Sequence, residues 1–274
     1  MHTRKSTIYT SGRDSLKTAI IKVWEHKNLI WVFAKRDIQV KYSQTYLGII
    51  WSFFKPLLSL FIYVLFFGIV LKWQTGEVPY AVYVLSGLIG WNLFSYIVNN
   101  GVVSVHESSD IIKKIYFPKS ILPFSKMLVG IVDALISLVL LLPLMLYYEV
   151  GMTWKIIFMP LVLLFNAICG LSISFLIAAI SIKKRDILQV LPFLIHMAIW
   201  FTPVFLSTDV FPEKLHFFFS INPIANVIEL WRWVLFDGVT FQWVWVIDFF
   251  TTAILLLIGF YFYTYREDKF ADFI

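Results

Sequence analysis

The sequence predicts an all-α integral membrane protein with six transmembrane helices, and three observations carry this prediction. First, 59% of the 274 residues are hydrophobic and 15% are charged, against about 45–50% and about 25% in soluble domains. Second, six stretches are long and apolar enough to cross a membrane. Third, lysines and arginines gather on one side of these stretches. The composition excludes disorder, and a single cysteine, Cys169, excludes a disulfide scaffold or a cysteine-based metal site.

Residues 1–47 form a predicted basic segment on the cytoplasmic side, ahead of a transmembrane domain at 48–274. The segment holds nine lysines or arginines and three acids, so it carries the whole net charge of +6. Because it adjoins the first apolar stretch, we expect it to bind anionic lipid rather than nucleic acid. An apolar stripe predicts an amphipathic helix in the membrane interface, and Lys27 interrupts it, which favours two short helices. The stripe comprises Leu16, Ile20, Trp24, Trp31, Ala34 and Ile38. The segment either anchors the chain or also touches a cytoplasmic partner.

The six predicted spans follow from the length of about 20 apolar residues that a membrane helix needs. They cover about 49–71, 80–104, 121–148, 156–182, 187–206 and 242–264. Outside these spans, 17 lysines and arginines fall on one side of the membrane and four on the other. The excess of positive charge on cytoplasmic loops then places both termini in the cytoplasm.

Asp133 is the ionisable residue that lies deepest in a predicted span, 12 residues from its start and roughly 18 Å along the helix. A charge at that depth requires a partner, a water-filled cavity or protonation. Lys55 and Lys126 are candidate partners, although both could instead extend to the lipid head groups. Three interpretations stay open: structural pairing, a place beside a polar conduit, and proton coupling.

The 51 aromatic residues allow two interpretations. Many belong to belts at the two membrane interfaces, while others lie at mid-depth, where they either face lipid or line a conduit that stacks against sugar rings. The candidates for a substrate path are therefore Trp51, Trp91, Phe94, Tyr96 and Asp133. A separate stripe of small residues, at Gly170, Ser174 and Ala178, predicts close helix packing within or between chains.

Residues 209–241 are too apolar for a free loop, yet a seventh span would move the C-terminus outside. Asn222-Pro223 divides the stretch, because proline disfavours helix at the preceding residue and suits a helix start. We therefore predict two short helices that dip into the outer leaflet and return. Glu229 and Arg232, three residues apart, are expected to pair. The alternative is a lid that only packs on the outer face.

Motifs for nucleotide or metal binding are missing from the sequence. No G-x-x-x-x-G-K-[ST] segment is present to cradle phosphates, and the five histidines form no H-E-x-x-H pair. We therefore expect no ATP site, no metal and no catalytic activity in this chain.

Several segments resemble one family of membrane proteins. They are RDIQVKY (36–42), TYLGIIW (45–51), KPL (55–57), GLIGWNLFS (87–95), IKKIYFPK (112–119), ILP (121–123), RDI (185–187), WFTPV (200–204) and NP (222–223). Together they cover about residues 30–265. In this order the segments resemble the polysaccharide-export permeases of the type 2 ABC transporter class, the membrane subunits of O-antigen, capsule and teichoic acid exporters.

The resemblance implies a homodimer that works with two copies of a separate cytoplasmic ATPase, which binds ATP and Mg²⁺. It implies outward transport of a lipid-linked glycan across the bacterial cytoplasmic membrane. It also implies a short coupling helix at about Ser104–Tyr116 that docks on the ATPase, with a tail helix around Leu29–Tyr42 nearby. The implied coupling residues are Arg36, Asp37, Glu107, Asp110, Lys113, Lys114 and Tyr116, and the implied outer gate is Asn222, Pro223, Glu229 and Arg232. The alternatives are a drug-efflux permease of the same class and a membrane-embedded glycosyltransferase or ligase.

Overall fold

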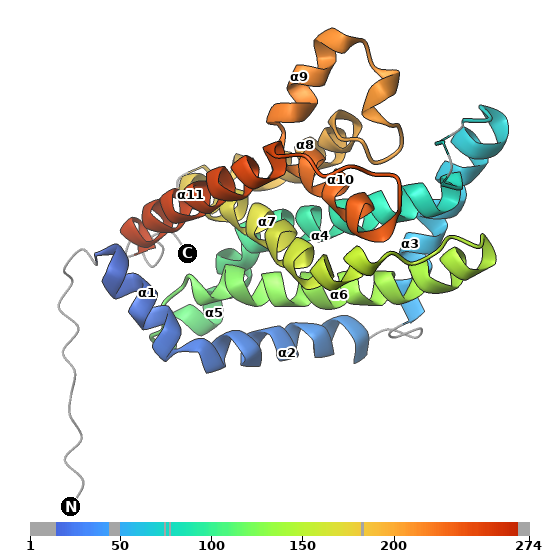
Figure 1. Cartoon of the computed structure of the whole chain (residues 1–274). Coiled ribbons are helices and arrows are strands. Elements are labelled where there is room, and N and C mark those ends of the chain that lie inside the picture. Colours follow the sequence, from blue (N-terminus) through green and yellow to red (C-terminus); the bar gives the residue numbers. More distant parts are fainter. Residues whose placement is uncertain (1–14, 44–49, 74, 77, 182–183, 268–274) are drawn as a thin grey trace, which may run out of the picture.

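The computed structural model describes residues 15–43, 50–73, 75–76, 78–181 and 184–267. Within these ranges the regular secondary structure is helical. Four long helices, α4 (Tyr80–Glu107), α6 (Ile121–Tyr147), α7 (Met159–Ser181) and α11 (Val244–Tyr265), run lengthwise along the molecule (Figure 1). The segments 1–14 and 45–49, which hold part of the basic tail and most of the TYLGIIW segment, lie outside the described residues, as do Lys183 and Lys269.

The basic segment contains the two short helices that its interrupted stripe predicts. Helix α1 (Leu16–Glu25) begins at Ser15, whose hydroxyl accepts the Thr18 amide at 3.3 Å, and α2 (Lys27–Ser43) follows after His26. Helix α2 runs alongside the N-terminal half of α6 (Figure 1). Phe33 and Ala34 are buried, whereas Ile20, Trp24 and Trp31 of the apolar stripe are exposed.

Five segments are long and apolar enough to cross a membrane, and they match five of the six predicted spans within a few residues. They are α3 (Ile50–Tyr63) with the π-helical η1 (Val64–Val70), α4, α6, η2 (Trp154–Phe158) with α7, and α11. The protein is therefore a multi-pass membrane protein.

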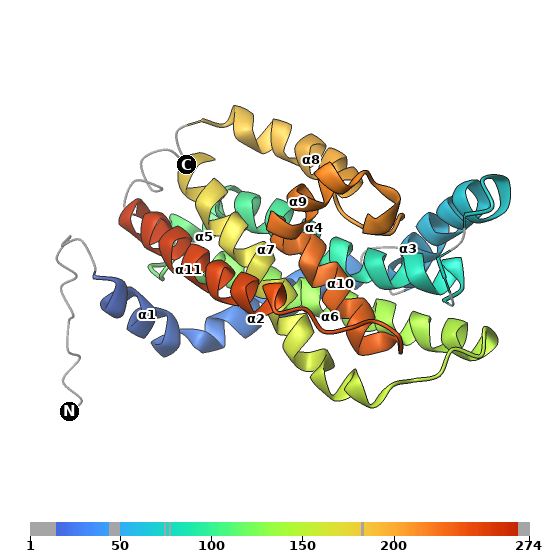
Figure 2. The same ribbon diagram turned by 45° about the horizontal axis from the view of Figure 1, so that its top comes forward.

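The predicted span at 187–206 is shorter than expected. Helix α8 (Asp186–Ala198) continues into one turn, η3 (Ile199–Phe201), and the helix stops at Thr202. Thr202 has extended backbone angles (φ −131°, ψ 149°) because it precedes Pro203, whose ring disfavours helix at the residue before it. The segment still runs in the direction of the long helices (Figure 2).

Helix α4 forms the centre of the bundle. In an apolar stretch of 18 residues of α4, 83% of the residues are buried. The helix packs against α6, α7 and α10 (Pro223–Leu235). The small-residue stripe of α7 allows this close approach. A Cβ atom on Gly170 would lie 3.0 Å from Cβ of Ile97, and one on Gly101 would collide with Ser174. The stripe thus packs helices within the chain.

The first span is the least enclosed. Only 11% of its apolar window is buried, and α3 leans away from the other long helices (Figure 2). Its exposed side chains include Phe54, Phe61 and Phe66. The rest of the described chain therefore packs against very little of the first span.

The connection after α4 differs from the expected pattern, whereas the 209–241 stretch forms the two short helices that were predicted. The predicted coupling helix at 104–116 is replaced by the last turn of α4 and a one-turn helix, α5 (Ser109–Ile112).

In the 209–241 stretch, the turn η4 (Thr208–Val210) precedes α9 (Glu213–Ile221) and then α10. Asn222 caps α10 by accepting the Ile224 amide at 3.2 Å. Helix α10 is largely buried, whereas α9 stands away from the bundle (Figure 1).

Candidate functional site

A polar pocket of about 710 Å³ lies between α2, α3, α4 and α6. Its lining is rich in hydroxyl, amide and charged side chains, although three of these helices are strongly apolar. The lining residues are Lys41, Tyr42, Trp51, Ser52, Lys55, Pro56, Ser59, Ile89, Asn92, Leu93, Ser95, Tyr96, Asn99, Asn100, Asp133, Ala134 and Ser137. An open pocket with this many polar and charged side chains between apolar helices is a candidate binding site.

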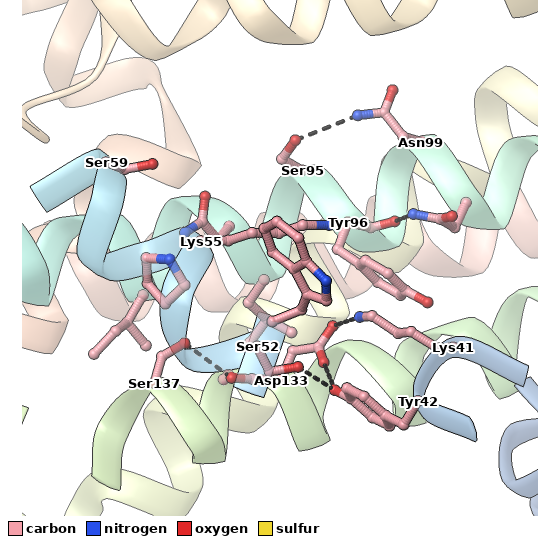
Figure 3. Close-up of a pocket in the computed structure, with 17 residues that line it drawn as sticks. Lys41, Tyr42, Ser52, Lys55, Ser59, Ser95, Tyr96, Asn99, Asp133 and Ser137 are labelled. Atoms are coloured by element: carbon pink, nitrogen blue, oxygen red, sulfur yellow. Dashed lines mark hydrogen bonds and ion pairs between the residues drawn. The ribbon is translucent and has the colours of Figure 1, made fainter. Parts of the chain in front are cut away.

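Asp133 of α6 joins three other elements at the wall of this pocket (Figure 3). One carboxylate oxygen pairs with the ammonium of Lys41, and the other accepts the hydroxyl of Tyr42 at 2.6 Å. Ser52 of α3 donates in turn to the Tyr42 oxygen at 2.8 Å. The Lys41 ammonium also lies 4.8 Å from the ring centre of Tyr96 on α4. One charge pair therefore connects α2, α3, α4 and α6.

Tyr42 stays a neutral donor in this arrangement. Burial, and next the hydrogen bond that it donates to Asp133, raise the pKa of Tyr42 well above its ordinary value. Because the phenol keeps its proton at all ordinary pH values, it supplies Asp133 with a permanent hydrogen bond.

A second charge cluster lies closer to the end of the bundle that carries α5. Lys126 of α6 donates to Glu107 at the end of α4 (2.9 Å) and forms an ion pair with Asp37 of α2 (3.1 Å). Arg36 binds Asp37 at 2.7 Å. The Asp37 and Lys126 side chains are almost enclosed, and Glu107 is half exposed.

The two clusters hold α2 against α6 with crossed charges. Asp37 of α2 meets Lys126 of α6, and further along the same two helices Lys41 meets Asp133. Sliding α2 by one turn towards the α5 end would bring Lys41 next to Lys126, and like charges repel. The arrangement therefore sets both the register and the direction of α2.

The segment after α5 presents an exposed surface of mixed character. Lys113, Lys114, Ile115 and Tyr116 are exposed, as is Asp110 within α5 itself. Phe117 at its end is buried, and its ring lies 5.3 Å from that of Phe33 on α2. This surface and α2 are therefore neighbours, as the tail-helix prediction requires.

A third cluster lies at the other end of the bundle and centres on Arg232 of α10. Its guanidinium donates to Glu229 (2.7 Å) and to the main-chain oxygens of Pro203 (2.5 Å) and Val204 (3.1 Å). The Tyr83 ring of α4 lies 3.5 Å from the guanidinium carbon. Arg232 is 1% exposed, so it fixes α10 to α4 and to the chain after η3. The predicted pairing of Glu229 and Arg232 is confirmed.

Three of the five predicted path residues line the pocket, and two do not. Trp51, Tyr96 and Asp133 are lining residues. Trp91 and Phe94 are buried elsewhere, with their rings 5.6 Å apart. Their place on a substrate path therefore stays a prediction, because α4 is packed on nearly every side and the sequence does not show which of its aromatics faces the cavity.

The partners expected for Asp133 were wrong. Lys126 belongs to the Asp37 and Glu107 cluster, and Lys55 lines the pocket without contacting Asp133. The true partners, Lys41 and Tyr42, come from a segment about 90 positions earlier in the chain. The RDIQVKY segment could have indicated this pairing, because Asp37 and Lys41 lie four residues apart and so place opposite charges on one helical face. A further buried acid, Asp248 of α11, was missed and accepts Asn226 of α10 at 2.5 Å.

Comparisons with known proteins agree with this architecture. The family model described as "ABC-2 type transporter" matches residues 28–236. The chain is 26% identical over 218 residues to the O-antigen export system permease protein RfbA of Myxococcus xanthus, covering 79% of this chain and 83% of the relative. It is 27% identical over 252 residues to RfbA of Klebsiella pneumoniae, covering 89% and 94%. It is 24% identical over 243 residues to the polysialic acid transport protein KpsM of Escherichia coli, covering 85% and 91%.

Proposed function

Because the chain belongs to the ABC-2 type transporter family, we propose that it is the permease subunit of an ATP-driven exporter that moves a lipid-linked polysaccharide outward across the bacterial cytoplasmic membrane. The observation that carries the proposal is its similarity, over most of both chains, to permeases named for O-antigen export and polysialic acid transport. These names favour glycan export over drug efflux and over a membrane-embedded glycosyltransferase or ligase.

Energy would come from a separate ATP-binding subunit, present in two copies, that holds ATP and Mg²⁺. The surface that suits such a partner is the exposed segment after α5. Lys113 and Lys114 offer charge, while Ile115 and Tyr116, 62% and 64% exposed, offer apolar anchors. Aromatic anchors of this kind dominate the energy of many interfaces.

A second copy of the chain would complete the permease. The exposed face of α3 and η1 supports a homodimer. Only 11% of the residues in the apolar stretch of this span are buried within the chain, so its surface has room for a partner helix as well as for lipid. The pocket opens beside this same helix, so dimerisation would enclose the pocket further.

Transport in this proposal is indirect. Closure of the ATPase dimer would displace the α5 segment, and the contact between Phe117 and Phe33 would pass the motion to α2. The crossed ion pairs would then carry it along α6 to the pocket. The buried Arg232 cluster keeps the outer end of α4 fixed to α10, so in this proposal an outer gate at Asn222, Pro223, Glu229 and Arg232 would be anchored at Arg232.

The proposed topology has six spans and two cytoplasmic termini, with α8 and η3 crossing the membrane despite their length. The basic residues gathered at the α5 end support this orientation. Reporter fusions at residues 110 and 184 are expected to read inside, and fusions at 75, 152 and 225 outside. Opposite readings at 110 and 184 would mean that an odd number of crossings lies between these two positions, so the proposed number of spans would be wrong.

Reversing two charges tests the partner surface. We expect the double substitution Lys113→Glu and Lys114→Glu to lower export at least about 10-fold, because two repulsive contacts at an interface cost well over about 1.4 kcal/mol. The amount of permease in the membrane should stay unchanged. The measurements are glycan at the cell surface and co-purification of the ATP-binding subunit.

The matched control is Lys214→Glu, a charge reversal on the exposed face of α9, which should leave both measurements unchanged. Normal export and normal co-purification in the double variant would remove the docking role. Stimulation of the purified complex's ATPase activity by lipid-linked glycan tests the function itself, and stimulation by small amphiphiles alone would instead support drug efflux.

A further inference from the structure

The main chain between α5 and α6 is held by the end of α11. The Lys119 amide donates to Oε1 of Glu267 at 2.5 Å, and the Lys119 carbonyl oxygen accepts the Tyr263 hydroxyl at 3.1 Å. The Lys119 ammonium donates to the main-chain oxygen of Glu267 at 2.8 Å. We call these three contacts the Lys119 clasp. They engage both main-chain groups of one residue, so they fix the backbone there and not only a side chain.

The α11 side of the clasp is itself anchored to α7. Tyr263 is 0% exposed, and its ring lies 5.0 Å from that of Phe175. Arg266 donates to the main-chain oxygen of Ala179 at 2.7 Å. Because α7 ends at Ser181, this oxygen is one of the last four, which have no partner within the helix. The end of α11 therefore holds the end of α7 on one side and the clasp on the other.

The clasp lies next to the surface proposed to receive the ATP-binding subunit. Lys119 is three residues after the exposed Tyr116 and immediately before Ser120, the N-cap of α6. The C-terminal end of α11 and α5 lie at the same end of the bundle (Figure 1). A displacement of the exposed segment after α5 therefore reaches the clasp and α6 within a few residues.

Two of the contacts on this segment differ in kind. The ring of Phe117 packs on that of Phe33 of α2, and apolar packing has no preferred direction. The clasp consists of hydrogen bonds, whose strength depends on distance and angle. A ring can slide across its neighbour, whereas the clasped backbone cannot turn without breaking its bonds. The clasp is therefore better suited to transfer a directed movement than the Phe117 contact is.

We propose that the Lys119 clasp carries the movement of the ATP-binding subunit into α11 and α7, with Tyr263 and Glu267 as positioning residues for the ATP-driven step. The proposal rests on the proposed export function and adds a second route to the one through α2. With the clasp intact, a displaced segment moves the ends of α6, α7 and α11 together. Without the clasp, the segment moves alone, and ATP is hydrolysed with little export.

The test compares the wild type with the double variant Tyr263→Phe and Glu267→Ala. The complex of permease and ATP-binding subunit is placed in proteoliposomes with lipid-linked glycan extracted from the producing cells. Tyr263→Phe removes one hydroxyl and keeps the ring beside Phe175. We expect glycan export per ATP hydrolysed to fall at least about 10-fold, in line with the loss of two hydrogen bonds. Co-purification of the ATP-binding subunit and basal ATP hydrolysis should stay unchanged.

Two control variants separate positioning from stability. Glu267→Gln keeps an oxygen acceptor for the Lys119 amide and should retain most of the export per ATP. Tyr261→Phe removes a hydroxyl from a side chain of the same helix that is 45% exposed, and it should behave as the wild type. If the clasp were only a structural brace, export, ATP hydrolysis and melting temperature would instead fall together in the double variant.

Hydrogen exchange of backbone amides gives a readout that needs no glycan, because it reports local opening of each helix end. The complex is compared with and without ATP and vanadate, which trap the closed ATPase. We expect exchange at residues 113–116 to change in the wild type and in the double variant. At residues 175–181 and 260–266, exchange should change in the wild type alone.

Three results would overturn the proposal. Wild-type export per ATP in the double variant would remove the coupling role. A Glu267→Gln variant as defective as the double variant would show that the hydrogen bond to the Lys119 amide is not the basis of the effect. An equal exchange response at the ends of α7 and α11 in both proteins would show that the movement does not pass through the clasp.

Failure of the clasp and failure of the function remain distinguishable. If the extracted glycan stimulates ATP hydrolysis and is exported equally by the wild type and the double variant, the function holds and the clasp is wrong. If the exchange response of α7 and α11 depends on the clasp but the glycan neither stimulates hydrolysis nor is exported, the clasp holds and the export function is wrong.

Discussion

Asp133→Lys is expected to abolish export, and adding Lys41→Asp is expected to restore much of it. The single substitution places two ammonium groups together where the native chain has an ion pair, with Lys55 lining the same cavity. Breaking a fully buried pair costs about 3–5 kcal/mol. The cost here lies below that range, because the two side chains keep 32% and 25% exposure. Repulsion would still detach the end of α2 from the pocket.

The restoring variant separates electrostatics from packing. The pair Lys41→Asp with Asp133→Lys exchanges the two charges and re-forms the ion pair, although Tyr42 loses its acceptor. We therefore expect recovery to at least about a tenth of wild-type export. A coupling energy of about 1–3 kcal/mol between the two positions is typical of charges in direct contact.

The control for this series is Lys35→Asp, which makes the same charge change on the exposed side of α2. It should export normally. The measurements are surface glycan, permease abundance and melting temperature for each of the four variants of the cycle. Equal defects in the single and double variants would show that the pair does not hold α2 in register.

Arg232→Met is expected to give the largest loss of stability among single substitutions at the outer end. It leaves Glu229 without its partner and removes the donor to the carbonyls of Pro203 and Val204. Removing one partner of a buried pair costs about 3–5 kcal/mol. For a chain of about this size, each kcal/mol lowers the melting temperature by about 2–4 °C, so we expect a fall of roughly 6–20 °C.

Two further variants test the cause of this loss. Arg232→Lys keeps the charge but not the planar fork that reaches Glu229 and both carbonyls, so it should be intermediate. Arg266→Met is the matched control, since among the described residues Arg266 donates to one carbonyl, that of Ala179 at 2.7 Å, and is not fully buried. A melting temperature for Arg232→Met equal to that of Arg266→Met would contradict the anchoring role.

Much of the fold could be predicted because lipid restricts what a chain can do. A backbone in hydrocarbon must satisfy its own hydrogen bonds, so long apolar stretches become helices. Five spans therefore follow directly from hydropathy. The segment at 187–206 departed from this rule because Pro203 ends the helix at Thr202. Asn222-Pro223 divides α9 from α10 by the same local chemistry.

The candidate site was predictable only in part. Asp133 was identifiable from its depth alone, since an isolated acid in an apolar stretch needs an explanation. That Trp91 and Phe94 lie outside the pocket could not be predicted, because hydropathy gives the length of a helix but not the direction in which each side chain points. Helix α4 carries aromatic residues on several sides, and only the packing of its neighbours determines that Tyr96 faces the cavity.

By itself, the sequence determined the membrane class, the position of the long helices, the basic end of the molecule and the local pair of Glu229 and Arg232. Each of these depends on composition or on residues a few positions apart. The tertiary structure alone decided that Lys41 neutralises Asp133, that Lys126 joins Asp37 and Glu107, and that Lys55 forms an ion pair with none of the described residues. Such pairings depend on which helices are neighbours and how each is rotated, and these are set by packing between side chains distant in the sequence.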